Sequence, residues 1–105
     1  MSSPAHSTLL IAASFGIALA ATANGENDYT RTCSACHNLG VAGAPKLGDT
    51  EAWSERVTKD KEELYRHAIK GFAGDEGVMP PKGGFSNLTD DQVKAIVDYM
   101  VSKAE

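Results

Sequence analysis

The stretch Cys33-Ser34-Ala35-Cys36-His37 decides how the rest of the chain can be interpreted. Two thiols three residues apart on one helical turn face the same side, and an imidazole follows the second thiol directly. This C-x-x-C-H spacing is the attachment signature of c-type haem, because each thiol can bond one vinyl group of the same macrocycle. The stretch therefore predicts one covalently bound haem c, linked through Cys33 and Cys36, with His37 as an axial ligand of the iron.

Other uses of the two cysteines fit the sequence less well. A dithiol redox pair is typical of a βαβ context, and the chain has no alternating strand pattern. A zinc site needs four ligands, and after residue 37 only His67 remains as a histidine. A structural disulfide leaves His37 unexplained. A thiol protein without haem stays an alternative that an absorption spectrum would separate from the haem hypothesis.

A second axial ligand is predicted at Met79. It lies in Gly77-Val78-Met79-Pro80-Pro81, where the prolines fix the chain direction and the thioether is a soft ligand for haem iron. Met100 and His67 are the alternatives. Met100 falls on the apolar stripe of the last predicted helix, which favours core packing, and His67 lies on a helix among charged residues, which favours a solvated position.

Size and charge exclude several classes of protein. A chain of 105 residues and 11.1 kDa holds one domain. Its 10 Lys and Arg against 14 Asp and Glu give a net charge of −4, which argues against nucleic acid or an anionic membrane surface as the main partner.

The charge-free residues 1–23 predict a signal peptide. An apolar run ends in Ala21-Thr22-Ala23, a small-x-small cleavage site, so the mature domain would be residues 24–105, exported to the periplasm and without a membrane span. An uncleaved anchor is the alternative. It is less favoured because the 15-residue run from Leu9 to Ala23 is shorter than the roughly 20 residues that a spanning helix needs.

Apolar periodicity after the leader predicts an all-α domain. The expected helices are Asp28 to about Cys36 with Asp28 at its positive end, Glu51–Lys59, Lys61–Lys70, and a last helix that begins at Thr89 and carries an apolar stripe to Val101. Thr89 and Gln92 form a capping box for the last helix. The glycine-rich segments 40–48 and 71–84 are expected to be irregular loops.

The motifs together resemble the class I cytochromes c, most closely the small bacterial cytochrome c₅ group. The matching stretches lie within residues 29–101 and are Tyr29-x3-Cys33-x2-Cys36-His37, Gly40 to Asp49, Trp53-x2-Arg56 and Met79-Pro80-Pro81-Lys82-Gly83. The resemblance implies a small cytochrome c fold, with three to five helices wrapped around one haem, His37 and Met79 as axial ligands, and Cys33 and Cys36 as thioether links.

Three further residues are expected at the haem. The resemblance implies that the carbonyl of Pro45 accepts the Nδ1 proton of His37, which would fix the imidazole. Trp53 and Arg56 share a helix face, and their N–H groups are interpreted as donors to a haem propionate. The alternative is a core tryptophan beside a solvated arginine.

The chain departs from the resemblance at one place. Members of the cytochrome c₅ group often carry a second C-x-x-C that forms a disulfide after the methionine loop, but here those positions read Phe85-Ser86-Asn87-Leu88. We expect the two apolar side chains to pack there instead. The first and last helices cross in this group, which suits Tyr29 and Tyr99 near that contact.

These features predict a periplasmic carrier of single electrons and not an enzyme, because iron with two axial ligands has no open site for a substrate. The alternative is a haem enzyme or gas sensor, such as a small peroxidase, with a labile sixth ligand. It would need a distal acid–base group, and no His or Arg lies close to Met79 in the sequence.

The expected partners are redox proteins, such as respiratory complexes, oxidases or reductases, that meet a monomeric or weakly associating chain. The segments Leu39–Ala44 and Val78–Pro81 are apolar and uncharged. They are expected to flank the haem edge and to form a small docking patch for transient contact.

Overall fold

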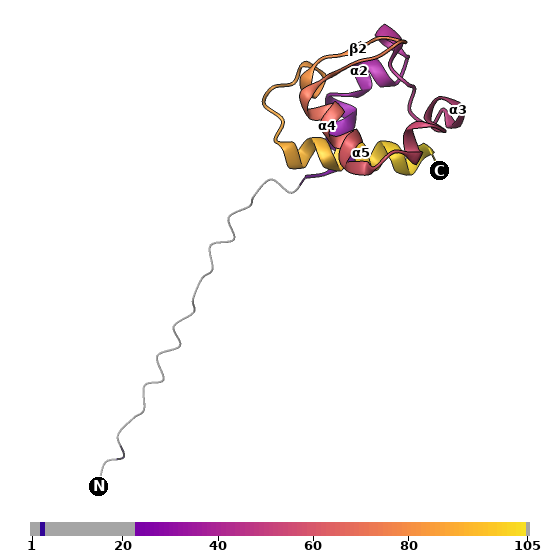
Figure 1. The fold of residues 1–105 in the computed structure, drawn as a ribbon. Helices are drawn as coiled ribbons and strands as arrows, with labels where there is room; N and C mark the ends of the chain where they lie inside the picture. Colours follow the sequence, from indigo (N-terminus) through magenta and orange to yellow (C-terminus); the bar gives the residue numbers. More distant parts are fainter. Residues whose placement is uncertain (1–2, 4–22, 105) are drawn as a thin grey trace.

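The structure is a computed structural model that describes residue 3 and residues 23–104, and Figure 1 shows its helices arranged around a central space. The predicted leader, residues 1–23, lies almost wholly outside the described residues. The helices are α1 (Gly25–Arg31), α2 (Ser34–His37), α3 (Thr50–Trp53), α4 (Lys61–Lys70) and α5 (Asp90–Ala104). Three 3₁₀ turns, η1 (Val41–Gly43), η2 (Arg56–Thr58) and η3 (Pro81–Gly84), and two short strands, β1 (Phe72–Ala73) and β2 (Val78–Met79), complete the order.

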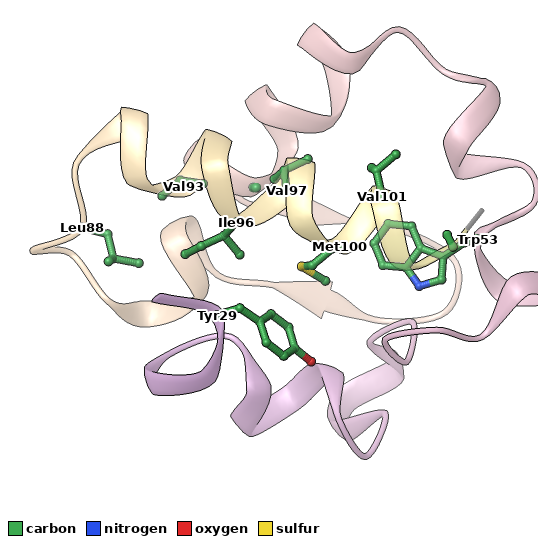
Figure 2. Close-up of a cluster of buried hydrophobic side chains, with 10 residues drawn as sticks. Tyr29, Trp53, Leu88, Val93, Ile96, Val97, Met100 and Val101 are labelled. Carbon is green, nitrogen blue, oxygen red and sulfur yellow. The ribbon is translucent and has the colours of Figure 1, made fainter. Parts of the chain in front are cut away.

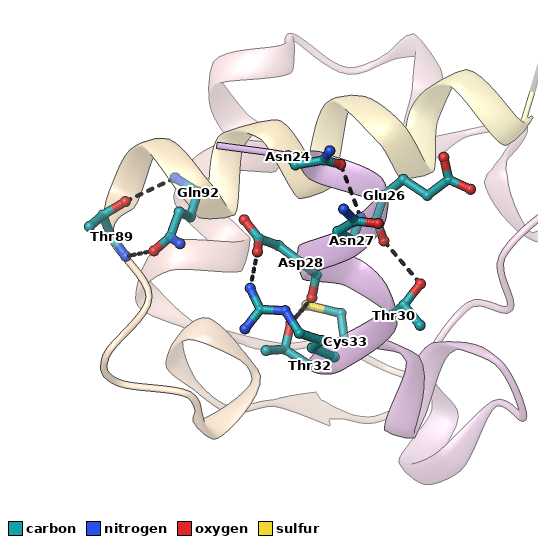
Figure 3. A network of polar contacts seen from close by, with 10 residues as sticks. Asn24, Glu26, Asn27, Asp28, Thr30, Thr32, Cys33, Thr89 and Gln92 are labelled. Carbon is teal, nitrogen blue, oxygen red and sulfur yellow. Dashed lines mark hydrogen bonds and ion pairs between the residues drawn. The ribbon is translucent and has the colours of Figure 1, made fainter. Parts of the chain in front are cut away.

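The predicted bounds of α4 and the predicted start of α5 are confirmed. Helix α4 spans Lys61–Lys70 and ends at Gly71, whose φ of 87° suits glycine. Helix α5 begins at the predicted capping box. The backbone N–H of Thr89 donates to Oε1 of Gln92 at 2.8 Å, and the N–H of Gln92 donates to Oγ1 of Thr89 at 3.1 Å (Figure 3). No helix within the described residues is long and apolar enough to cross a membrane.

The prediction for the first helix is wrong at both ends. Helix α1 begins at Gly25 because the side chain of Asn24 caps it, accepting the N–H of Asn27 at 3.1 Å (Figure 3). The helix stops at Thr32, whose φ of −128° is not helical, and a separate short helix, α2, follows. Asp28 therefore lies inside α1, where it is buried and paired with Arg31.

Two other segments also differ from the prediction. The segment predicted as one helix, Glu51–Lys59, is divided into α3, a single turn capped by Asp49, and the 3₁₀ turn η2. The predicted loop 71–84 contains an antiparallel hairpin that pairs Phe72 with Met79 and Ala73 with Val78. Strands of two residues are too short to show alternation in a sequence. The all-α class is confirmed, with this hairpin as a small addition.

The hydrophobic core follows the apolar stripe of α5. Val93, Ile96, Val97, Met100 and Val101 are buried along it, as predicted. Figure 2 shows Leu88 beside one end of the helix and Trp53 beside the other. Leu88 is buried and Phe85 packs partly buried against the same cluster, as expected for apolar side chains at these positions.

Helix α1 packs closely across α5. A Cβ atom on Gly25 would lie 2.2 Å from the carbonyl oxygen of Ala95, so only glycine allows this approach. The rings of Tyr29 and Tyr99 meet in the same contact with centroids 5.5 Å apart, which confirms the expected location of both tyrosines.

Two loops cross in contact above the core. A Cβ atom on Gly43, in η1, would lie 1.9 Å from the carbonyl oxygen of Glu76, and a Cβ atom on Gly77 would lie 2.0 Å from the carbonyl oxygen of Ala42. Both neighbours are backbone atoms, which cannot move aside as a flexible side chain does. The glycines therefore permit the loop after α2 to touch the hairpin that carries Met79.

We expect Gly43→Ala to be much more destabilising than Gly48→Ala. The φ angles of Gly43 and Gly48 are 79° and 80°, so alanine costs about 1–2 kcal/mol of backbone strain at either position. Nothing lies within 4 Å of a Cβ on Gly48, whereas alanine at 43 meets backbone and should cost about 1–3 kcal/mol more. Urea unfolding of the haem-loaded protein measures both losses; equal losses would show that the loops do not touch.

Candidate functional site

A cavity of about 620 Å³, lined mostly by apolar groups, lies inside the ring of helices. The predicted site residues all contribute to its wall, although they come from α2, α3, η2, β2 and the loop after α2: Cys33, Cys36, His37, Pro45, Trp53, Arg56 and Met79. The fold therefore brings together groups that are 46 positions apart in the sequence.

The imidazole of His37 is buried and held in one orientation. Its Nδ1 lies 2.8 Å from the carbonyl oxygen of Pro45, as the resemblance implied. A carbonyl only accepts, so Nδ1 carries the proton and Nε2 keeps a lone pair for a metal. Burial lowers the pKa of His37; the bond to Pro45 opposes this shift and the nearby Arg56 adds to it. The neutral ring is the form that ligates a metal.

Trp53 is buried, and its indole Nε1–H donates to the carbonyl oxygen of Lys46 at 2.8 Å. Its expected contact with a propionate stays a prediction. The short segment that contains Lys46 is also held at Leu47, whose N–H donates to the carbonyl oxygen of His37 at 2.8 Å. Trp53 thus braces the segment that presents the Pro45 carbonyl. Sequence reasoning did not find this role, because the partner is a backbone atom seven residues away.

Arg56 lies at the wall of the cavity with its side chain about one-third exposed. Its Nη1 donates to the carbonyl oxygen of Ala52, and its Nη2 lies 3.6 Å from Oε2 of Glu76, at a side-chain exposure of 31%. The guanidinium is therefore neither free in solvent nor fully buried. Its expected contact with a propionate stays a prediction.

The three candidates for the second axial ligand all line the cavity. Met79 is partly buried on β2, and Met100 is buried in the core cluster, as expected. The solvated position predicted for His67 is wrong, because its ring stacks on Phe72 with centroids 4.3 Å apart. The sequence could not reveal this stack, since Phe72 reaches His67 only after α4 ends and the chain reverses.

Cys33 and Cys36 are not joined by a disulfide in this structure, which leaves both sulfurs available for thioether links. Cys33 is half-buried at the N-cap of α2, and Cys36 is exposed on α2. Burial raises the pKa of the Cys33 thiol, while the hydroxyl of Thr32, 3.4 Å from its sulfur, opposes the shift.

These groups fit haem c. The cavity has the volume of a site for a cofactor of drug size and an apolar wall suited to a macrocycle. Two thiols three residues apart can form the covalent links, His37 offers Nε2, and Met79 offers a soft thioether within the same cavity.

Comparisons with known proteins agree with this chemistry. A family model described as "Cytochrome C oxidase, cbb3-type, subunit III" matches residues 20–100. Cytochrome c-555 of Chlorobaculum tepidum is 43% identical over 79% of this chain and 77% of that protein. Cytochrome c5 of Ectopseudomonas mendocina is 40% identical over 65% of this chain and 76% of that protein.

Two solved structures are also similar. The cytochrome c described in an electron transfer complex with nitrite reductase has a TM-score of 0.69 and 37% identity, over 77% of this chain and 94% of that one. A mono-haem ferrocytochrome c from Shewanella putrefaciens has a TM-score of 0.62 and 36% identity, over 78% of this chain and 95% of that one.

The chain belongs to the cytochrome c family. Its relatives include small monohaem cytochromes, named cytochrome c-555 and cytochrome c5. Membership implies a covalently bound haem c, and Cys33 and Cys36 have the spacing that this link requires.

We expect the purified protein to carry one haem that resists extraction. Its mass should equal that of the polypeptide plus one haem, because two thioether bonds survive acid–acetone treatment, whereas coordination through His37 alone does not. A double variant, Cys33→Ala with Cys36→Ala, is the control and should release its haem. Mass spectrometry and the colour of the extract measure both, and extractable haem in the unmodified protein would contradict the covalent link.

Proposed function

We propose that this chain is a periplasmic carrier of single electrons, with His37 and Met79 as the two axial ligands of its haem iron. One observation carries the proposal: the oriented His37 imidazole and the Met79 thioether line the same apolar cavity as the attachment cysteines. The predicted signal peptide, residues 1–23, supports export to the periplasm, where small exported redox carriers act.

Haem iron supplies reversible one-electron chemistry when bound. The residues of this chain adjust that chemistry and do not add a reaction of their own. The hydrogen bond from His37 to Pro45 holds the imidazole and raises its basicity. The apolar wall keeps water away and disfavours the additional charge of oxidised iron, which together with a thioether ligand raises the reduction potential.

A haem enzyme with a labile sixth ligand is the alternative. No His or Arg lies close to Met79 in the sequence, but the fold brings one of each to the cavity. His67 and Arg56 both line its wall. However, the ring of His67 is stacked on Phe72 with its Nε2 3.7 Å from Oε1 of Glu63, and the guanidinium of Arg56 is bonded to the carbonyl of Ala52. Neither side chain is left as an unengaged acid–base group, which favours the carrier.

The docking patch predicted from sequence lies at the mouth of the cavity. Val41 and Val78 line the cavity and are also 48% and 66% exposed, and Leu39 is 77% exposed beside them. Asp75 and Glu76 are exposed in the turn of the hairpin that carries Val78, and Arg56 and Lys59 line the same cavity, so the rim carries both signs of charge. The net charge of −4 on the whole chain favours a redox enzyme that presents an apolar face bordered by basic residues.

We expect Met79→Ala to remove the weak long-wavelength absorption band of a ferric iron–thioether bond. The variant should also bind cyanide readily and have a lower reduction potential, because one axial position loses its ligand. Met100→Leu is the control: it conserves volume in the core, should keep the band, and should cost less than about 1.5 kcal/mol of stability. If Met100→Leu removes the band instead, the ligand assignment is wrong.

We expect Val41→Asp to slow electron transfer to a basic redox partner while the absorption spectrum stays unchanged. A carboxylate at the apolar centre must be desolvated when the partner docks, which lowers the rate. Asn87→Asp adds the same charge at an exposed position away from the cavity and should leave the rate unchanged. Stopped-flow rates measured against ionic strength test this.

The salt dependence of the unmodified protein provides the second half of the test. A mostly apolar contact predicts only a modest fall in rate with ionic strength. A steep fall, combined with an unchanged rate in Val41→Asp, would place docking on a charged face elsewhere.

A further inference from the structure

Lys82 has an unusual backbone conformation just after the predicted ligand Met79. Its φ of 54° and ψ of 27° lie in the left-handed region, within the turn η3. Gly83 and Gly84, which follow, also have positive φ angles of 62° and 88°. Glycine adopts this region without strain, whereas lysine does so at a cost. Lysine is therefore strained at the first of three left-handed positions, which indicates that its side chain has a role that glycine could not fill.

The side chain of Lys82 ties the turn to the start of α5. Its Nζ donates to the carbonyl oxygen of Leu88 at 2.7 Å and lies 3.1 Å from Oδ1 of Asp90. The Lys82 side chain is only 21% exposed, whereas that of Asp90 is 63% exposed, so water screens the ion pair more than the hydrogen bond to Leu88. We call this pair of contacts the lysine clasp. It joins η3 to the residue before the α5 cap and to the first residue of α5.

The Met79 segment has contacts on both sides. Its side chain packs partly buried against the core, and a Cβ atom on Gly71 would lie 3.0 Å from the Met79 carbonyl oxygen, so the lysine clasp adds a polar contact to an apolar one. On its N-terminal side, Met79 belongs to a two-residue strand whose partner, Phe72–Ala73, is exposed. On its C-terminal side, Pro80 and Pro81 fix the chain direction. The backbone N–H of Gly83 donates to the carbonyl oxygen of Pro80 at 2.9 Å, which closes the turn. The clasp therefore acts on Met79 through a stiff connection of two residues.

We propose that Lys82 is a positioning residue for Met79, and that the lysine clasp keeps the thioether at the iron by anchoring the turn that follows it. The inference rests on the proposed ligation by Met79. The left-handed strain at Lys82 persists because the clasp opposes it, since strained conformations survive only where the surroundings hold them.

The variant Lys82→Gly tests the anchoring by itself. Glycine adopts the left-handed conformation without strain, so a faster displacement of Met79 in this variant is caused by loss of the clasp. We expect exogenous imidazole to displace Met79 in the ferric protein about tenfold faster or more, the change expected when a charge-assisted hydrogen bond is lost. Lys82→Arg keeps a cation with several N–H donors and should restore a rate near that of the unmodified protein. Loss of the iron–thioether band with time measures the displacement.

Three further variants complete the comparison. Asp90→Asn removes only the ion pair and should give an intermediate rate of displacement. This variant also tests the clasp if Lys82→Gly does not fold. Lys103→Ala removes an equal charge from an exposed residue of α5 that does not line the cavity, and should leave the rate unchanged. Val93→Ala lowers stability in the core away from the cavity, and its urea midpoint shows how much displacement general destabilisation causes.

The outcomes distinguish the proposal from the function on which it rests. If the unmodified protein lacks the iron–thioether band, both the Met79 ligation and the lysine clasp are overturned. If the band is present but imidazole displaces Met79 at the same rate in Lys82→Gly as in the unmodified protein, the clasp alone is overturned. The clasp is also overturned if imidazole displaces Met79 no faster in Lys82→Gly than in Val93→Ala when the two variants are equally stable.

Discussion

The hydrogen bond from His37 Nδ1 to the carbonyl of Pro45 is the interaction on which the rest of the site depends. It selects the tautomer that leaves Nε2 for the iron, and it fixes where the loop after α2 can run. That loop reaches the hairpin at Gly43, whose missing side chain leaves room for the backbone of Glu76. The same hairpin carries Met79, so the positions of the two proposed ligands are joined through one line of backbone contacts.

Helix α5 serves the core and the cavity at once. Val97 and Met100 are buried in the hydrophobic cluster and also line the cavity. A domain of this size buries little apolar surface by its own chain, so a bound macrocycle that fills the cavity adds to the same core. Stability and redox chemistry are therefore coupled, and a change on this face of α5 affects both.

Elements with strong local signals were predictable from the sequence. The bounds of α4 followed from its apolar spacing and Gly71, and the start of α5 followed from the capping box at Thr89. The first helix was predicted wrongly because Asn24 is an equally good cap and lies at the edge of the predicted leader. The hairpin escaped prediction because its pairing joins residues across a turn with no local periodicity.

The sequence by itself determined the cofactor chemistry, because the thiols and the imidazole act from one helical turn whose spacing is local. It also indicated Met79, since the flanking prolines impose their geometry locally. Only the tertiary structure decided what Trp53, His67 and Lys82 do. Their partners are the carbonyl of Lys46, the ring of Phe72, and the carbonyl of Leu88 with Asp90. These contacts depend on how the chain reverses between elements, and no residue pattern along the sequence records that.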